Sequence, residues 1–452
     1  MSYSTDLDVR RSYSADVSGL VMIPDAVARP TTAAETRDIL RRASSERTPV
    51  TAAGGQTSTT GASICDCGVL LSMRAMNRIV DVDVAARRAV VEPGVLLADL
   101  NRAVAPHGLQ FAPDPTSEED VTVGGAIACN ASGARSLLYG TTRVHVRTLE
   151  VVRADGEIVN VGRSGLDKNT AGYAFAHDPV DWFIGSEGTL GVIVQAELSL
   201  VPLPSRVIGL GIPCRDETSA LELVIAIREA TLLHPRCIEY FDELALSIAR
   251  EHSGRDWAVG AGALVYVEEI ATNDGDAALE QWLGIAEDHG AEGNLLVFDG
   301  DAALRDARKM RHAVPTTMNE RGTARRPHGG RKVSTDWAVP YRRLPEAIAE
   351  ARRVVDAAGL DQPVIYGHAG NGHPHENFIA HDGDQLRKIE AVVEATLKHA
   401  LSLGGTVSAE HGIGKIKRKW LPLQASPLQI GVMRSVKREL DPLGILAPGN
   451  IL

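Results

Sequence analysis

Three glycine-rich segments, set among short runs of β-branched residues, constrain this chain most. The segments are 51–61 (TAAGGQTSTTG), 123–133 (VGGAIACNASG) and 183–193 (FIGSEGTLGVI). Glycine reaches backbone conformations with positive φ and lets other groups approach the backbone closely. The apolar runs 88–92, 149–153 and 191–200 have the composition of strands. Between about Val50 and Leu203 the sequence therefore predicts strands joined by structured loops.

A different pattern follows from about residue 205 to residue 379. Apolar residues at 279, 282, 283 and 286, and again at 348, 351, 355 and 358, fall on one face of a helix. Apolar runs at 263–267, 295–298 and 364–366 predict strands between the helices. We expect an α+β domain in which an antiparallel sheet carries helices on one face. After residue 404 we expect one more short strand, a helix and a terminal turn.

The predicted domains are therefore 1–204, 205–415 and a C-terminal segment, 416–452, that packs on the first domain. A chain of 452 residues is long enough for two or more domains. Its formal net charge of −11 argues against a nucleic-acid partner. No apolar run is as long as a membrane span, and the N-terminus has no apolar core typical of a secretory signal. We expect a soluble, cytoplasmic protein.

The first glycine loop has the composition of an anion site. Gly54 and Gly55 permit backbone N–H groups to converge, and Thr57 and Ser58 add hydroxyl donors, so a pyrophosphate would suit the loop. An ordinary glycine and threonine turn is an equal alternative. The chain contains neither G-x-G-x-x-G nor the P-loop pattern, so a dinucleotide, if bound, is not bound in a Rossmann site.

The second loop places small residues at nearly every position from 123 to 133, after the segment Ala112-Pro113-Asp114-Pro115-Thr116. Such a run lets a flat ring or a ribityl chain lie against the backbone. The third loop and the segment Glu410-His411-Gly412-Ile413-Gly414 complete a series of four motifs in order. Together they resemble the FAD-binding PCMH-type flavoproteins of the vanillyl-alcohol oxidase superfamily. Within it the chain is most similar to the D-2-hydroxyacid dehydrogenase branch of D-lactate dehydrogenase, the glycolate oxidase flavin subunit and D-2-hydroxyglutarate dehydrogenase.

This resemblance implies a PCMH-type FAD domain, an α+β substrate-binding cap domain and a C-terminal segment that returns to the flavin. The implied FAD contacts are Gly54, Gly55, Gln56, Thr57, Ser58, Pro113, Thr116, Gly124, Gly125, Ala128, Asn130, Gly133, Glu187, Gly188, Ile193 and Asn450. Covalent attachment in the superfamily commonly uses a histidine of the first loop, and residues 51–63 contain none. We expect non-covalent FAD, with Cys129 a packed thiol; Cys65 and Cys67 are expected to pack as well.

Histidines gather in the segment Tyr366–Asn377 and at 411. His368 and His375 flank a Gly-Asn-Gly turn, so two strands joined by a tight reversal could bring both imidazoles to one edge. With Glu410 from an expected next strand they form a two-histidine, one-carboxylate set that suits Zn²⁺ or Mn²⁺. The alternative is that histidines beside glycines bind nothing.

The family motif implies that His368, His375 and Glu410 are metal ligands, that Asn377 lies near the substrate and that His411 is the general base. The chain departs from that motif at two positions, with Asn371 in place of Asp and His373 in place of Asn. The first change removes a carboxylate that could orient a ligand, and the second adds a histidine that could ligate or compete.

Cations gather where an acidic substrate would need them. Arg311 and Lys332 match carboxylate contacts of the family. Arg325, Arg326 and Arg331 could bind a second carboxylate or form a solvated basic loop.

The implied activity is FAD-dependent, metal-assisted oxidation of a D-2-hydroxy acid, with electrons passed to a quinone, cytochrome or electron-transfer flavoprotein. Peripheral membrane attachment through that acceptor and a homodimer are compatible with this activity. Segment 112–116 favours a D-lactate-like substrate over D-2-hydroxyglutarate. Two other classes stay open: a redox-neutral flavoenzyme of the alkylglycerone-phosphate synthase type, and a flavin-free metallohydrolase.

Overall fold

The computed structural model describes residues 3–230, 233–271, 275–289, 291 and 295–452, and divides into two compact units. The first unit comprises residues 3–132, 140–203 and 410–452. The second comprises residues 133–139 and the described part of 204–409. The predicted boundaries differ from these units in three places, since they gave 133–139 and Pro204 to the first domain and 410–415 to the second.

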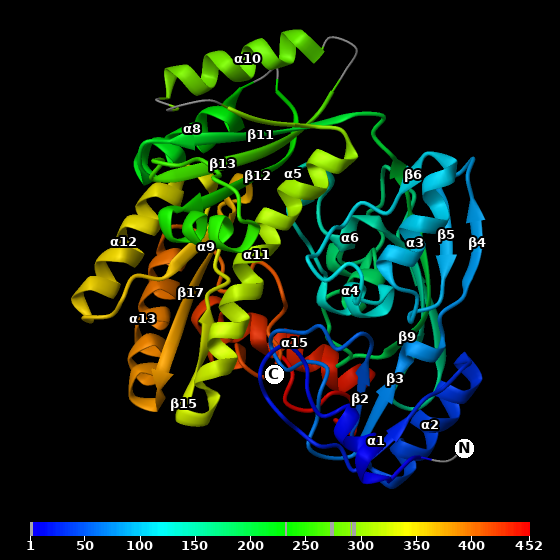
Figure 1. Ribbon diagram of the computed structural model, residues 1–452. Coiled ribbons are helices and arrows are strands. Elements are labelled where there is room, and N and C mark those ends of the chain that lie inside the picture. The colour runs from blue at the N-terminus through cyan, green and yellow to red at the C-terminus, as the bar shows by residue number, and fades with distance from the viewer. Residues whose placement is uncertain (1–2, 231–232, 272–274, 290, 292–294) are drawn as a thin grey trace. The chain divides into compact units, whose positions relative to one another are not determined.

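The first unit contains two main sheets (Figure 1). A parallel sheet has the order β1–β3–β2, and an antiparallel sheet has the order β4–β5–β9–β7–β8. The elements of this unit are α1 (Leu7–Ser12), β1 (Ala26–Ala28), α2 (Ala33–Glu46), β2 (Val50–Ala53), β3 (Val69–Ser72), β4 (Ile79–Asp83), β5 (Arg88–Val91), α3 (Leu97–Val104), β6 (Leu109–Gln110), α4 (Val123–Cys129), α6 (Thr142–His145), β7 (Val146–Val152), β8 (Ile158–Gly162), α7 (Val180–Phe183), β9 (Val192–Ser199), β10 (Val201–Pro202), α14 (Leu421–Gln424) and α15 (Pro427–Leu440). The strands predicted at 88–92, 149–153 and 191–200 are confirmed as β5, β7 and β9.

The second unit is built on one antiparallel sheet with the order β14–β11–β13–β12–β16–β17–β15. Its elements are α5 (Ser136–Tyr139), β11 (Val207–Cys214), α8 (Glu217–Glu229), β12 (Pro235–Asp242), α9 (Glu243–Ser253), β13 (Ala263–Ile270), α10 (Gly275–Asp288), β14 (Leu296–Asp299), α11 (Asp301–Arg325), β15 (Gly329–Ser334), α12 (Leu344–Ala357), β16 (Val364–His368), β17 (His373–Asp382) and α13 (Gly383–Ser402). The predicted helices at 279–286 and 348–358 are confirmed as α10 and α12, and the predicted strands at 263–267, 295–298 and 364–366 as β13, β14 and β16.

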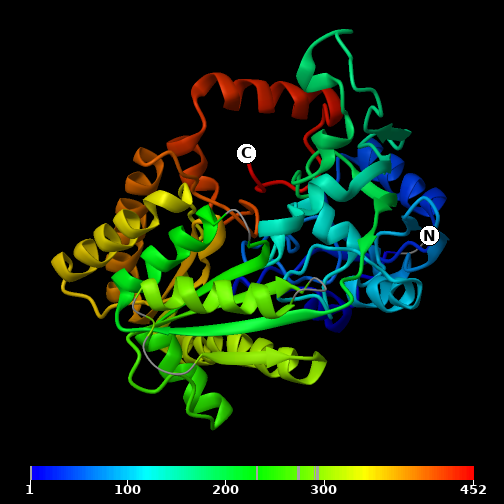
Figure 2. The ribbon, with the colours of Figure 1, turned by 90° about the horizontal axis from the view of Figure 1, so that it is seen from above.

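Helices cover both faces of this sheet, so the prediction that they cover one face is wrong. Phe241 of β12 lies in a hydrophobic cluster with residues of α9 and α11. The next residue back, Tyr240, points to the opposite face because side chains alternate along a strand. There its hydroxyl donates to Glu217 of α8 at 2.8 Å, and Arg352 of α12 binds the same carboxylate. Figure 2 shows α12 and α13 side by side.

The described residues after 404 include helices but no strand. Thr406 makes only an isolated bridge to Ala338, and residues 407–414 form a loop, so the strand expected after residue 404 is wrong. Ser426 begins α15 with a capping box to Gln429. Within the described residues, no helix is both long enough and apolar enough to cross a membrane.

Candidate functional site

The first two glycine loops pack against each other in the first unit. A Cβ on Gly54 would lie 2.2 Å from Thr122 Oγ1, and a Cβ on Gly55 would lie 2.0 Å from the carbonyl oxygen of Asp120. Both distances are far below van der Waals contact, so only glycine fits at these positions. Gln56 follows with a positive φ of 55°, and its side-chain amide donates to the carbonyl of Tyr13 at 3.0 Å. The loop is therefore a fixed backbone turn.

The third loop holds the segment that carries the predicted general base. The Glu187 carboxylate accepts the backbone N–H of Ile413 at 2.6 Å and that of Gly414 at 2.9 Å. Burial raises the pKa of Glu187 above its ordinary value, although these two donors oppose the rise. Thr60 of the first loop donates to the carbonyl of His411 at 3.2 Å. Glu187 thus fixes the backbone of residues 411–414 through these hydrogen bonds, a role that the resemblance did not indicate.

Asn450 connects three of these segments. Its amide nitrogen donates to the carbonyl of Ala62 at 2.9 Å and to that of Glu187 at 3.3 Å, while Lys415 donates to its amide oxygen at 2.7 Å. The side chain is buried. The C-terminus therefore returns to the glycine loops within the first unit.

The remaining predicted FAD contacts occupy several kinds of position. Ser58 accepts the N–H groups of Thr60 and Ala62, and Asn130, with φ of 48°, accepts the N–H of Arg143. Ile193 packs in the core. Of the others, Pro113 is buried; Thr57, Gly124, Gly125 and Ala128 are half-buried; Thr116 is exposed; Gly188 has positive φ; and Gly133 belongs to the second unit. Their contacts with FAD stay predictions.

The first unit fits a flavin nucleotide, and its non-covalent attachment stays a prediction. A Cβ on Gly124 would lie 2.5 Å from the Cβ of Pro93, so α4 packs closely against residue 93 only because residue 124 is glycine. The small side chains of the second loop would let a flat ring lie against its backbone. Burial, with help from Glu187 and Asp16, raises the pKa of Cys129 to about 12. At neutral pH this residue is therefore a thiol and not the thiolate that covalent attachment would need.

In the second unit, β16 and β17 form the predicted hairpin, and three histidines converge on it. Tyr366 pairs with His375 and His368 with His373 across the hairpin. Ring centroids lie 4.4 Å apart for His373 and His375, 5.5 Å for His368 and His375, and 5.6 Å for His368 and His373. One ring nitrogen from each lies within 4.8 Å of the others, and all three side chains are buried. His373, a departure from the family motif, thus joins the cluster.

Glu239 of β12 orients His368, and the sequence analysis missed it. Its Oε1 lies 2.6 Å from His368 Nδ1, and its other oxygen accepts from Arg311 Nε. Burial alone would raise the pKa of this carboxyl, but Arg311 and His368 lower it to about 2. An ionised carboxylate beside Nδ1 favours a proton on that nitrogen, so Nε2 is the nitrogen that a metal would use; Arg311 Nη2 lies 3.3 Å from it.

Asp336 orients His373 as Glu239 orients His368. Its Oδ1 lies 3.0 Å from His373 Nε2, and its Oδ2 accepts from Ser408 at 3.2 Å. Asn371, which replaces the aspartate of the motif, lies exposed in the turn. The carboxylates that orient these histidines therefore come from Glu239 and Asp336, outside the motif.

These residues fit a divalent metal ion. Imidazole nitrogens suit Zn²⁺ and other transition ions, and a buried carboxylate behind a ligating histidine is a usual feature of such centres. Two of the three rings have that carboxylate. The predicted ligands His368 and His375 are brought together here.

Glu410 and His411 lie in a loop of the first unit, directly after Ala409, the last residue of the second. The expectation that Glu410 lies on a strand is therefore wrong. Ser132 donates to Glu410 Oε1 at 2.9 Å, and Glu410 Oε2 lies 4.0 Å from His411 Nε2. His411 has a positive φ of 64°, and its side chain is 40% exposed. Glu410 as ligand and His411 as base stay predictions.

The predicted carboxylate contacts lie on α11 and β15. Gly322 of α11 packs against Lys332, where a Cβ would lie 2.6 Å from the lysine Cβ. Lys332 Nζ donates to Asn319 at 3.0 Å, and burial lowers its pKa to about 8. Asn377 is fully buried, and its amide bonds to Ser334 and to the carbonyl of His375.

The other predicted cations are three arginines that precede Lys332 in the sequence. Arg331, one residue earlier on β15, pairs with Glu390 of α13 at 3.0 Å. Arg325 and Arg326 are exposed.

Two family descriptions match the chain. The FAD binding domain matches residues 24–162, and the C-terminal domain of FAD linked oxidases matches residues 203–451. The first range contains the first two glycine loops, and the second contains the histidine hairpin and residues 410–414, while the third loop, 183–193, lies between the two ranges.

Curated relatives match nearly the whole chain. A D-lactate dehydrogenase of Archaeoglobus fulgidus is 32% identical over 94% of this chain and 91% of its own. The glycolate oxidase subunit GlcD of Bacillus subtilis is 30% identical over 95% and 89%. A D-2-hydroxyglutarate dehydrogenase of Xanthomonas citri pv. viticola is 29% identical over 95% and 89%.

Among solved structures, an alkyldihydroxyacetonephosphate synthase aligns with a TM-score of 0.74 at 17% identity, covering 99% of this chain and 83% of that one. A likeness at that identity shows the fold alone.

Proposed function

The chain belongs to the family of FAD-linked oxidases, and from this we propose that it oxidises a D-2-hydroxy acid to the 2-oxo acid. The observation that carries the proposal is the joint presence of a flavin-type loop cluster and a buried histidine cluster with its own cations. Relatives named D-lactate dehydrogenase and D-2-hydroxyglutarate dehydrogenase, matched over 91% and 89% of their own length, support it.

Substrate binding falls to Arg311 and Lys332. A guanidinium presents a fork that matches a carboxylate, and a lysine adds a point charge. Glu239 fixes the Arg311 guanidinium through Nε, so its orientation is set before substrate arrives. Lys332 is held toward α11 by Asn319.

Proton removal falls to His411, which takes the proton of the substrate hydroxyl as general base. Bound FAD supplies an acceptor for the hydride from the substrate Cα, and each turnover thus removes two electrons and two protons from the acid. His368, His375 and Glu410, with His373 nearby, would hold a Zn²⁺ or Mn²⁺ ion. Such an ion supplies Lewis acidity that makes the hydroxyl easier to deprotonate.

The electron acceptor in this proposal is a quinone, a cytochrome or an electron-transfer flavoprotein. The sequence disfavours NAD as the acceptor, because it contains no G-x-G-x-x-G pattern of the kind that binds nicotinamide dinucleotides. Attachment at a membrane surface would follow from a quinone acceptor, and a cytoplasmic location from the others.

The test is a plate of D-2-hydroxy acids and their L enantiomers with an artificial dye as acceptor, each with and without chelator. We expect dye reduction and a 2-oxo acid with D acids, and slower reduction after chelation. No 2-oxo acid from any D acid would overturn the proposal and favour a redox-neutral flavoenzyme. A colourless protein that cannot be reconstituted with FAD would favour a metallohydrolase.

A further inference from the structure

Three arginines surround one buried glutamate in the second unit. Glu268 of β13 accepts Nε and Nη2 of Arg236, each at 2.6 Å. Arg135 Nε lies 3.9 Å from the same carboxylate, and Arg308 Nε of α11 lies 3.7 Å from its other oxygen. That oxygen already accepts the hydroxyl of Tyr266 at 3.1 Å.

Glu268 cannot satisfy all of this charge. Two nitrogens of Arg236 contact one oxygen of Glu268, whereas the distance from Arg308 to the other oxygen exceeds that of a hydrogen bond. Even if Arg135 is set aside, two guanidiniums face one carboxylate, which leaves one positive charge in excess. The side chains of Arg236 and Glu268 are about 5% exposed, but that of Arg308 is 41% exposed. The excess charge therefore lies where a ligand can reach it.

The surroundings of Arg308 disfavour its charge. Burial, then the neighbouring Arg135 and Arg236, lower the pKa of Arg308 against the pull of Glu268. His312, one turn further along α11, has its pKa lowered to about 4 by burial and by Arg311 and Arg308. An anion at Arg308 would relieve this repulsion.

This cluster is close to the proposed carboxylate contact. Arg308 and Arg311 are three residues apart on α11 and so lie on one face, separated by about 4.5 Å along the helix. In the sheet beneath, Glu239, which holds Arg311, is the register partner of Tyr266, which binds Glu268. The two cationic groups are therefore neighbours on one face of the sheet.

We propose that Arg308, backed by Arg236 and Arg135, binds a second anionic group of the substrate, which makes a D-2-hydroxy dicarboxylate the preferred class. The inference rests on the proposed function, because it takes Arg311 and Lys332 as the contact of the first carboxylate. It differs from the sequence expectation, which favoured a D-lactate-like acid and offered Arg325, Arg326 and Arg331 for any second carboxylate.

Binding without turnover tests the inference separately from the redox chemistry. Calorimetry on the FAD-loaded protein compares glutarate with pentanoate, which has the same carbon chain and one carboxylate. We expect glutarate to bind at least about tenfold more tightly, because a charge-assisted contact adds at least that factor. Equal affinity overturns the second anion site, whereas failure of every D-2-hydroxy acid to reduce the flavin overturns the proposed function.

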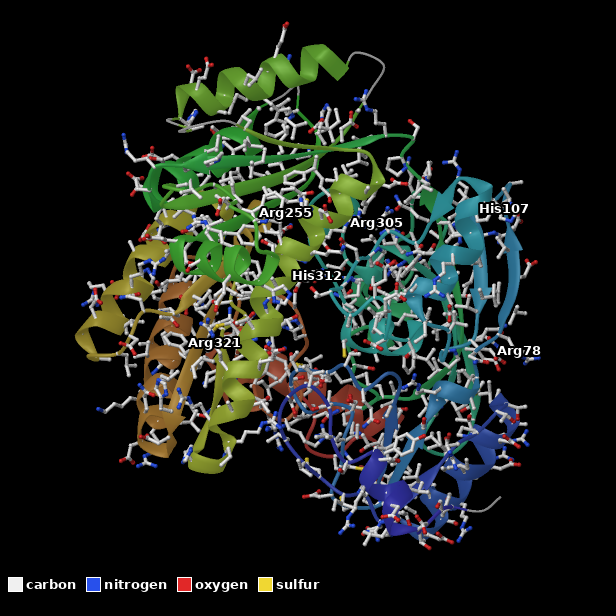
Figure 3. The ribbon with its side chains drawn as sticks, viewed as in Figure 1. Arg78, His107, Arg255, Arg305, His312 and Arg321 are labelled. Carbon is white, nitrogen blue, oxygen red and sulfur yellow. The ribbon has the colours of Figure 1, made fainter. Side chains whose placement is uncertain are left out.

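Two variants assign the effect to Arg308. Arg308→Gln should bind glutarate and pentanoate equally. Arg321→Gln is the matched control, because Arg321 lies on the same helix, is 47% exposed and pairs with Glu251. Arg321 follows His312 by nine residues, or about two and a half helical turns, and therefore lies on the opposite side of α11 (Figure 3). If Arg308→Gln loses its FAD, Arg308→Lys replaces it and should give an intermediate ratio. A wild-type ratio in either Arg308 variant overturns the assignment.

Discussion

The two units build their functional groups in different ways. In the first unit, the candidate cofactor site is made of loops whose residues are consecutive in the sequence. Their close packing depends on backbone atoms and on glycines such as Gly54 and Gly55, where a Cβ would clash. In the second unit, the candidate substrate site is made of charged side chains, such as Glu239 and Arg311, that lie far apart in the sequence. Substitutions in the glycine loops of the first unit should therefore affect cofactor content. Substitutions in the second unit, and at His411 in the loop that follows it along the chain, should affect substrate binding and chemistry.

The largest effect is expected at His411. Its change to alanine removes the proposed base, and loss of a general base typically costs about 10²- to 10⁴-fold in rate. Stopped-flow measurement should show flavin reduction by substrate slowed by at least about 10²-fold with FAD content unchanged. Normal reduction would refute the role, and loss of FAD would mean that residue 411 belongs functionally with the candidate cofactor site.

The next largest effect is expected at Glu239. Glu239→Gln removes the charge that holds both His368 and Arg311, and loss of such a partner typically costs about 10- to 100-fold in metal affinity or activity. Turnover and metal content by elemental analysis measure it. Glu243→Gln, an exposed glutamate four residues later, is the control. Unchanged metal content and turnover would contradict the positioning role.

In the first unit, Gly55→Ala should lower bound FAD by about tenfold while the protein still folds. The new Cβ would meet the Asp120 carbonyl at 2.0 Å, and the loop must move. The ratio of flavin to protein absorbance gives the occupancy. At Gly165 nothing lies within 4 Å of an added Cβ, so Gly165→Ala should keep its FAD. Equal occupancy in the two variants would show that the loop does not hold the cofactor.

The smallest effect is a pH dependence from Lys332, whose pKa of about 8 lies below its ordinary value. Below pH 8 the amine is protonated and attracts a carboxylate, and above pH 8 that attraction is lost. KM should therefore rise by up to about tenfold between pH 7 and pH 9. Lys332→Arg, which stays charged, should flatten that rise; a KM that rises equally in the variant would assign the dependence elsewhere.

The sequence predicted the contiguous features better than the dispersed ones. The glycine loops and the β16–β17 hairpin were predictable because turn residues stand beside the strands they join. Glu239, Asp336 and Glu268 were not, since each is one acidic residue in an ordinary run and gains its partners only through strand register.

One local expectation failed for a physical reason, and one helix was not predicted at all. The loop at 407–414 resembles a strand in composition, but Glu187 takes the N–H groups of Ile413 and Gly414 that a ladder would use. The sequence analysis made no prediction for residues 301–325, which form the single helix α11 although Pro315, a usual helix breaker, lies in its interior.

A single-turnover experiment tests the central claim most directly. The FAD-loaded protein is mixed without oxygen with an excess of a D-2-hydroxy acid, D-lactate and D-2-hydroxyglutarate in turn, and both the visible flavin band and the 2-oxo acid are measured. The account predicts that the band bleaches and that one 2-oxo acid forms per flavin, with the dicarboxylate effective at lower concentration. A flavin that stays oxidised with every D acid would contradict it.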